Sequence, residues 1–445
     1  MEQRQYLKDF IRYASLNVLG MVALSCYILA DTFFVSQGLG ANGLAALNLA
    51  IPVYNFIHGS GLMLGMGGAI KYSVYRSQGN FRKTDAVFTN TVTLALGFAL
   101  CFVCAGLFLS GQIAALLGAD AEVFSMTNTY LKVLLLFSPA FLMNDVLICF
   151  VRNDGAPRLS MMGMIVGSLS NVVLDYVFIF PFGMGIFGAV LATGLAPVIS
   201  ICVMSAHFIK KRNQFHFQKG RPSLGASGNI LSLGVPSLVT EVASGVVIIV
   251  FNGILLSLKG NVGVAAYGVI ANLSLVVVAI FTGVAQGMQP LVSDAYGRGR
   301  KKDSLKFLRF GAVSVTALAA VVYMIVAFWA EPVASVFNSE GNPVLQEIAA
   351  GGLRLYFIGA FFAGINIVLV HFFAAVEKAA PAQIISLCRG IFFIIPAAFL
   401  LSSALGITGV WLAFPAAELL ALLLGLLLYR RNRKVLSLPV SESEI

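Results

Sequence analysis

The stretch YASLNVLGMVALSCYILADTFFVS, residues 13–36, is a run of mostly apolar residues with a single acid, Asp31. A helix of about 20 apolar residues crosses the roughly 30 Å hydrocarbon core of a bilayer, so this stretch predicts a membrane-spanning helix. A carboxylate at that depth costs about 2.5 to 3.5 kcal/mol on insertion scales and is normally retained for ion or substrate handling. The stretch therefore predicts a membrane protein with a site for a charged species around Asp31.

Apolar stretches of this kind recur along the whole chain. Of its 445 residues, 59% are hydrophobic and only 11% are charged, and the mean hydropathy is +0.90. A soluble protein of this length does not need so much apolar surface, so the composition predicts an all-α membrane protein. We expect twelve transmembrane helices, at approximately 13–36, 45–72, 86–110, 124–150, 159–181, 187–209, 228–257, 264–292, 305–330, 346–375, 382–403 and 406–429.

Lysine and arginine are distributed unevenly between the loops that join these spans. If the N-terminus is inside, 26 of the 29 basic residues fall on that side, and only Lys132, Lys259 and Arg354 fall on the other. Short loops rich in basic residues are retained in the cytoplasm. The pattern predicts a multi-pass protein of the cell membrane with both termini cytoplasmic. The net charge of +10 then reflects contact with the lipid bilayer, and no nucleic-acid partner is expected.

The second half of the chain repeats the first at an offset of 220 residues. GLGANGLAALNLAIPV at 38–53 aligns with LKGNVGVAAYGVIANL at 258–273, and the register persists at Gly67 and Gly287. Many transporters are built from two homologous halves. We therefore predict two pseudo-symmetric six-helix lobes.

The polar stretch after the sixth span supplies the connection between the predicted lobes. We expect an N-terminal lobe at 1–212, a cytoplasmic linker at 213–226 and a C-terminal lobe at 227–445.

The two halves differ in their acids. At this offset Asp31 corresponds to Phe251, and the positions of the second half that correspond to Asn171 and Asp175 hold no acid. Asn171 and Asp175 are four residues apart and project from one helix face. Oxygen ligands suit a hard cation such as Na⁺, although the carboxylates could bind protons instead. The sequence therefore predicts ion binding in the N-terminal lobe.

Common enzyme motifs do not explain the chain. It contains no GxxxxGK[ST], HExxH or GxSxG motif, and the GxGxxG at Gly38, Gly40 and Gly43 lies in a predicted outer loop without a preceding strand. ATP hydrolysis and the common hydrolase chemistries therefore lack their residues. We expect no enzyme activity and no cofactor, and we expect transport to be driven by an ion gradient.

Six motifs spread over nearly the whole chain carry a family resemblance. They are YILADTFFVSQGLGANGLAAL at 27–47, GLMLGMGGA at 61–69, RNDGAPR at 152–158, SNVVLDYVFIFPFGMGIFGAVLATGL at 170–195, LGVPSLVTE at 233–241 and AQGMQPLVSDAYGRGR at 285–300. Together they resemble the multidrug and toxic compound extrusion (MATE) transporters, most closely those of the prokaryotic branch.

This resemblance implies a cation site in the N-terminal lobe. In the family an aspartate of the first helix, an asparagine and an aspartate of the fifth, and a threonine of the sixth form it. The corresponding residues here are Asp31, Asn171, Asp175 and Thr193. They would couple transport to Na⁺ or H⁺, and they would be the metal ligands if the ion is Na⁺. Buried aspartates held for structure alone are the alternative.

Three further residues are candidates for substrate binding. Glu241 is an acid of the seventh span, the first span of the second half. The resemblance leaves it as a coupling residue, a substrate residue or a structural one. Tyr27 lies one turn before Asp31 and could stack on an aromatic cation. Asp145 could either pair with a basic loop residue or enlarge the acidic site. His58 is also within the membrane, where hydrogen-bonded packing is its simpler interpretation.

The resemblance implies a secondary active multidrug efflux transporter, with its two lobes arranged in a V around a central cavity. It would export small organic, mostly cationic and amphipathic compounds in exchange for Na⁺ or H⁺ by alternating access, and a monomer is expected. The alternative is a flippase of a lipid-linked or amphipathic metabolite in the wider superfamily. Such a flippase would want basic residues at mid-membrane depth, of which the sequence offers almost none.

Overall fold

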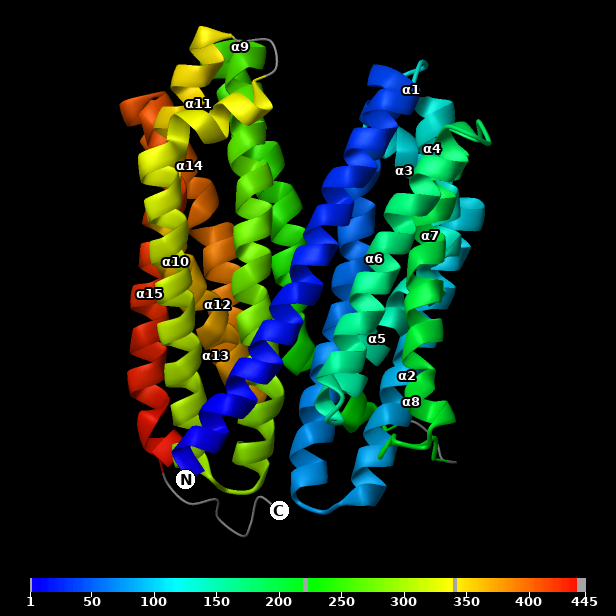
Figure 1. Ribbon diagram of the computed structural model, residues 1–445, viewed down its shortest axis with the longest axis vertical. Helices are drawn as coiled ribbons and strands as arrows, with labels where there is room; N and C mark the ends of the chain where they lie inside the picture. Colours follow the sequence, from blue (N-terminus) through cyan, green and yellow to red (C-terminus); the bar gives the residue numbers. More distant parts are fainter. Residues whose placement is uncertain (1, 219–222, 339–341, 438–445) are drawn as a thin grey trace. The chain divides into compact units, whose positions relative to one another are not determined.

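The computed structural model describes residues 2–218, 223–338 and 342–437, and within these ranges every regular element is helical (Figure 1). Local signals in the sequence start several of the helices. Asn80 caps α2 (Phe81–Phe108) by accepting a hydrogen bond from the backbone N–H of Lys83 at 3.1 Å. Asn342 caps α11 (Pro343–Tyr356) in the same way, with proline at the first helical position, where its missing N–H has no cost.

Two elements are much longer than one membrane crossing. They are α1 (Glu2–Ser77) and α9 (Leu224–Gly297), and each is interrupted at one glycine. Gly40 has φ 65° and ψ −159°, and Gly260 has φ 63° and ψ −153°, a conformation that L side chains rarely adopt. The two glycines occupy equivalent positions of the sequence repeat. Each long element therefore consists of two spans joined at the same place.

The number of crossings follows from these interruptions. The described residues contain nine helices that are long and apolar enough to cross a membrane, and the pair α4 (Phe124–Leu136) and α5 (Ser138–Asn153), bent by 49°, adds a tenth. Because α1 and α9 each supply two spans, the total is twelve. The predicted all-α membrane fold with twelve transmembrane helices is confirmed.

The chain forms two compact units. Unit 1 comprises Met1–Val18 and Ala243–Ile445, and unit 2 comprises Leu19–Val242, so that α1 and α9 each contribute to both. The other helices of unit 2 are α2, α3 (Ser110–Leu116), α4, α5, α6 (Pro157–Ile179), α7 (Gly185–Met204) and α8 (Ala206–Ile209). Those of unit 1 are α10 (Lys301–Phe337), α11, η1 (Phe357–Gly359), α12 (Ala360–Ala375), α13 (Ala379–Leu387), η2 (Cys388–Phe392), α14 (Ile394–Leu405) and α15 (Ile407–Ser437). The lobe limits at 212 and 227 stay a prediction from the sequence repeat.

Glycines bring helix backbones into direct contact within unit 2. A Cβ atom on Gly67 of α1 would lie 1.9 Å from the carbonyl oxygen of Ile230, and one on Gly234 of α9 would lie 1.8 Å from that of Met63. Small residues of this kind let membrane helices approach closely, which is how they gain contact energy in lipid. The second span of α1 and the start of α9 are therefore held together by their backbones.

Unit 1 contains the equivalent contact. A Cβ atom on Gly287 of α9 would lie 2.7 Å from the Cα of Ala14, and one on Gly283 would lie 2.7 Å from the Cα of Val18. Gly287 and Gly67 are the same position of the repeat. The duplicated glycine thus makes the same kind of helix crossing in both units.

An acid of the RNDGAPR motif holds the segment that follows the sixth span. Asp154 accepts hydrogen bonds from the Tyr72 hydroxyl at 2.5 Å, His207 Nε2 at 2.8 Å and the backbone N–H of Gln214 at 2.9 Å. Arg76 Nη1 lies 3.5 Å from the same carboxylate. This network fixes the start of the predicted linker to unit 2.

The rest of the described linker lies along α2. The backbone N–H groups of His216, Gln218 and Ser223 donate to the side chains of Asp85 at 2.8 Å, Thr89 at 2.9 Å and Asn90 at 3.2 Å, respectively. Both described parts of the linker are therefore bound to unit 2, and α9 begins there.

The backbone contact at Gly234 can be tested by one methyl group. We expect Gly234→Ala to lower thermal stability in detergent by about 1 to 3 kcal/mol, because the helices must separate to admit the Cβ atom. Gly97→Ala in α2 is the matched control, since nothing lies within 4 Å of that position and the change should be neutral or stabilising by up to about 1 kcal/mol. Equal melting temperatures for the two variants would contradict the contact.

Candidate functional site

The four residues of the predicted cation site come from three helices of unit 2. Asp31 lies on the first span of α1, Asn171 and Asp175 lie on α6, and Thr193 lies on α7. Asn171 and Asp175 are fully buried, while Asp31 and Thr193 are 7% and 4% exposed. The structure therefore removes all four from solvent and brings them together.

Their contacts form one connected group. The carboxyl groups of Asp31 and Asp175 lie close enough for the charge of each to act on the other. With its amide oriented to satisfy both neighbours, Asn171 donates to Asp175 Oδ2 at 3.0 Å and accepts from the backbone N–H of Thr193 at 3.2 Å. The Thr193 hydroxyl donates to the carbonyl of Ala189 at 3.1 Å, so its oxygen is oriented by its own helix.

The carboxyl pair has an unfilled requirement for positive charge. Two ionised carboxylates that lie close together repel each other, and neither can donate a hydrogen bond, so a proton or a cation between them is favourable. In addition, Oδ1 of Asp31 and Oδ1 of Asp175 are buried and have no hydrogen-bond partner among the described residues. A proton or a small cation would satisfy these oxygens. The donor set fits such a guest.

The available ligands are all oxygen atoms. A cation at this place would rest on two carboxylates with neutral amide and hydroxyl oxygens. This set suits a hard cation, and the carboxylates could bind a proton instead. No group of three or more His, Cys, Asp or Glu side chains that could hold a metal occurs in the described part of the chain.

Tyr130 joins the group, which the sequence did not reveal. It lies on α4, is 3% exposed and is close enough to Thr193, Asp31 and Asp175 to interact with all three. Tyrosines near the end of an apolar span are common, and nothing in the local sequence sets this one apart. Its contribution depends on the packing of α4 against α7.

A second polar group lies on neighbouring parts of unit 2. The hydroxyls of Tyr27 and Tyr54 are 2.6 Å apart, and the Tyr54 ring stacks on His58 with centroids 5.8 Å apart and an interplanar angle of 14°. His58 Nδ1 lies 3.0 Å from Asp145 Oδ2. Asp145 therefore pairs with a histidine of α1. Pairing with a basic loop residue was one of the two roles that the sequence suggested for it.

Glu241 approaches this second group from α9. A Cβ atom on Gly59 would lie 3.0 Å from the Cβ of Glu241, and the charge of Glu241 acts on His58. Tyr27, Asp145 and Glu241, the three predicted substrate-binding candidates, thus lie in one region of unit 2.

Unit 1 holds a different polar arrangement. Arg389, in the π-helical turn η2, donates to Glu418 Oε1 from Nη2 at 2.7 Å, and Asn366 Nδ2 donates to Glu418 Oε2 at 2.7 Å. The acid of the last span is therefore neutralised by a basic residue and an amide within the helical bundle. The sequence had assigned Arg389 only as a charge of the inner side.

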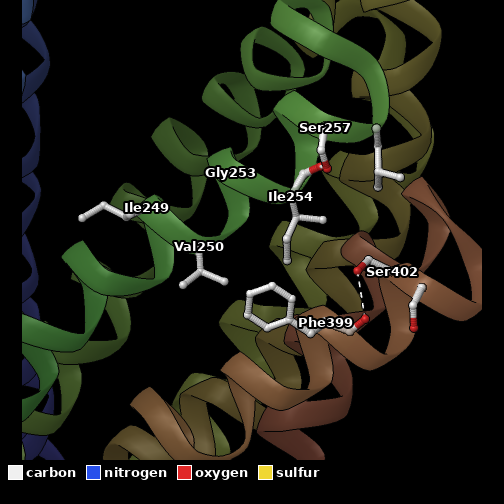
Figure 2. Close-up of a pocket in the computed structure, with 9 residues that line it drawn as sticks. Ile249, Val250, Gly253, Ile254, Ser257, Phe399 and Ser402 are labelled. Carbon is white, nitrogen blue, oxygen red and sulfur yellow. Dashed lines mark hydrogen bonds between the residues drawn. The ribbon is translucent and has the colours of Figure 1, made fainter.

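A groove of about 410 Å³ also lies in unit 1, between α9 and α14. Figure 2 shows its lining, in which Val250, Ile254 and Phe399 surround the space and Ser402 donates to its own helix at the Phe399 carbonyl. None of its lining residues is titratable. The groove therefore offers apolar contact but no ion chemistry.

Comparison with known proteins identifies the family. The chain matches the MatE family model over residues 18–177 and 236–422. It belongs to this family of membrane transporters, and the resemblance seen in its motifs is confirmed.

Relatives align along nearly the whole chain. The multidrug export protein MepA of Staphylococcus aureus (strain MRSA252) is 25% identical over 447 aligned residues, which cover 99% of this chain and 97% of the relative. The MepA protein of Staphylococcus saprophyticus is 25% identical and covers 96% and 94%, respectively.

Solved structures agree with the fold. A multidrug resistance MATE family transporter of the MOP superfamily, in an outward-facing conformation, matches with a TM-score of 0.91 at 22% identity over 96% of each chain. A MOP superfamily transporter from Pyrococcus furiosus matches with a TM-score of 0.90 at 23% identity over 97% of this chain and 96% of that one. These likenesses confirm the predicted MATE-like fold of two lobes.

A proton on the Asp31–Asp175 pair can be detected by infrared spectroscopy. We expect the protein to show the carbonyl band of a protonated carboxylic acid, and we expect Asp175→Asn to lose it, because the asparagine amide can donate to Asp31 without a shared proton. Glu331→Gln serves as a control, since that acid is exposed at the end of α10. A band that persists unchanged in Asp175→Asn would contradict the pair.

Proposed function

We propose that this protein is a secondary active efflux transporter that exports organic, mostly cationic compounds in exchange for Na⁺ or H⁺. The observation that carries the proposal is the buried Asp31–Asp175 pair with Asn171 and Thr193. Burial of two acids at bilayer depth is costly and is usually kept for ion handling. The multidrug export role named for the staphylococcal relatives supports the choice of substrate.

The pair would couple the ion to the substrate through charge. When a cation or a second proton enters, the Asp31–Asp175 pair loses its net negative charge. The contact between α1 and α6 then no longer depends on a shared proton. The first span of α1 can repack, because Asp31 makes its charge-dependent contact with α6. We propose that this repacking drives alternating access in a monomer of the cell membrane, with both termini cytoplasmic.

Transport in proteoliposomes tests this proposal. The probe is the fluorescent cation ethidium, and a Na⁺ gradient and a pH gradient are imposed separately. We expect one gradient to drive ethidium transport in the wild-type protein. We expect the ethidium transport rate of Asp31→Asn to be at least about tenfold lower, because a neutral amide cannot bind and release the coupling ion as a carboxylate does. Glu331→Gln should retain the wild-type rate.

The outcomes separate the candidate functions. Ethidium transport that is driven equally well in Asp31→Asn would refute ion coupling at this pair. A folded protein that moves no ethidium under either gradient would refute the organic-cation assignment, and it would favour the lipid-linked or metabolite substrates of a flippase.

A further inference from the structure

Three glycines of α1 make room for two acids from other helices. A Cβ atom on Gly61 would lie 2.4 Å from Asp145 Oδ2, and one on Gly65 would lie 2.8 Å from the backbone carbonyl oxygen of Asp145. Gly59 makes room in the same way for Glu241. A side chain at Gly65 would meet the backbone of α5, whereas one at Gly59 or Gly61 would displace the side chain of an acid. The three glycines therefore allow both acids to pack closely against this face of α1.

His58 lies on α1, next to Gly59, and interacts with both acids. Its Nδ1 is 3.0 Å from Asp145 Oδ2, and Asp145 and Glu241 both act on its charge. The side chain of His58 is 13% exposed, whereas that of Asp145 is 4% exposed. The histidine is therefore the more accessible member of the ion pair, and a proton could reach its ring without moving Asp145.

The contact between His58 and Asp145 depends on a proton on the histidine. With a neutral imidazole, the Asp145 carboxylate loses the positive charge that faces it at 3.0 Å, and uncompensated charge at bilayer depth is expensive. A monovalent organic cation bound against Asp145 would replace that charge, and the aromatic side chains of Tyr27 and Tyr54 lie beside this place.

We propose that His58, Asp145 and Glu241 form a second cation site, separate from the Asp31–Asp175 pair, at which a proton on His58 and an organic monocation exclude each other. The inference rests on the proposed function and names the acids that receive the exported cation. The groups that face His58 are Asp145 from α5, Glu241 from α9 and Tyr54 from its own helix. The Tyr27–Tyr54 hydrogen bond links this site, on the second span of α1, to the first span of α1, which carries Asp31.

Mutual exclusion has a thermodynamic signature. If binding of the organic cation releases one proton from His58, the Kd rises by about tenfold for each unit by which the pH falls through the range where His58 becomes protonated. The probe is tetraphenylphosphonium, whose positive charge does not depend on pH. We expect this rise in the wild-type protein and expect the part due to histidine to disappear in His58→Asn, whose Kd should remain near the value at high pH.

A matched variant controls for the loss of a membrane histidine. His371 lies on α12 in unit 1, and its Nδ1 bonds the carbonyl of Ile367 on its own helix at 2.9 Å. His371→Asn should keep the pH dependence of the wild-type protein. An identical pH dependence in His58→Asn and the wild-type protein would overturn the second site.

Nuclear magnetic resonance of the wild-type protein gives a test that does not depend on a His58 variant. The chain has four histidines, so the ¹⁵N signal of His58 can be assigned by elimination, with variants of the other three. At a pH where the His58 ring is charged, addition of tetraphenylphosphonium should convert it to the neutral form. A ring that stays charged when the cation is bound would overturn the proposal.

These measurements separate this inference from the proposed function. If tetraphenylphosphonium binds and is transported but leaves His58 unchanged, the second site is wrong and the export function stands. If the cation neither binds nor is transported by the folded protein, both fail. Glu241→Gln should weaken binding at high pH while the His58 ring still titrates, which a purely structural role of Glu241 would not produce.

Discussion

The structure depends on the cost of charge in a medium without water. Three groups of buried acids show how this cost is met: Asp31 and Asp175 face each other, Asp145 faces His58, and Glu418 faces Arg389. Of these three groups, the Glu418 group alone includes a permanent cation, because arginine does not lose its proton in proteins. The other two groups, both in unit 2, consist of side chains that can gain or lose a proton. These three groups therefore differ in whether their charge can change.

Glycine determines where these groups can form. In lipid there is no hydrophobic force between helices, so contacts depend on close packing and on polar bonds. Gly67 and Gly234 allow two backbones to meet in unit 2, and Gly61 leaves space on the same helix for the carboxylate of Asp145. The helix that carries the close contact thus also carries the opening for an acid. Packing and ion chemistry are set by neighbouring residues of one motif.

Much of the fold could be predicted from sequence, because apolar length is a direct record of bilayer thickness. The repeat also aligned Gly40 with Gly260, and these are the two positions where long helices are interrupted. Asp31, Asn171 and Asp175 were found because acids and amides are rare in such spans, and the family resemblance added Thr193. Their roles as ion ligands stay a prediction, as do the coupling ion, the monomeric state and the orientation of the termini.

The partners of these residues could not be predicted in the same way. A helix in lipid is apolar on every face, so its sequence does not show which side meets which neighbour. His58 was interpreted as a packing residue, and Arg389 as a charge of the inner side, although each forms an ion pair with an acid more than 25 residues away in the chain. Tyr130 was missed for the same reason. Contacts between spans are decided by tertiary packing, which periodicity does not record.

The bound linker has a mechanical consequence. Its described residues are bonded to α2 and Asp154, and α9 begins within unit 2, so the chain does not pass between the units in a loop. It passes instead inside two helices, between Val18 and Leu19 in α1 and between Val242 and Ala243 in α9. Relative displacement of the units must then bend or twist hydrogen-bonded helix. Bending or twisting of α1 and α9 distorts their backbone hydrogen bonds, so these two helices resist such a displacement.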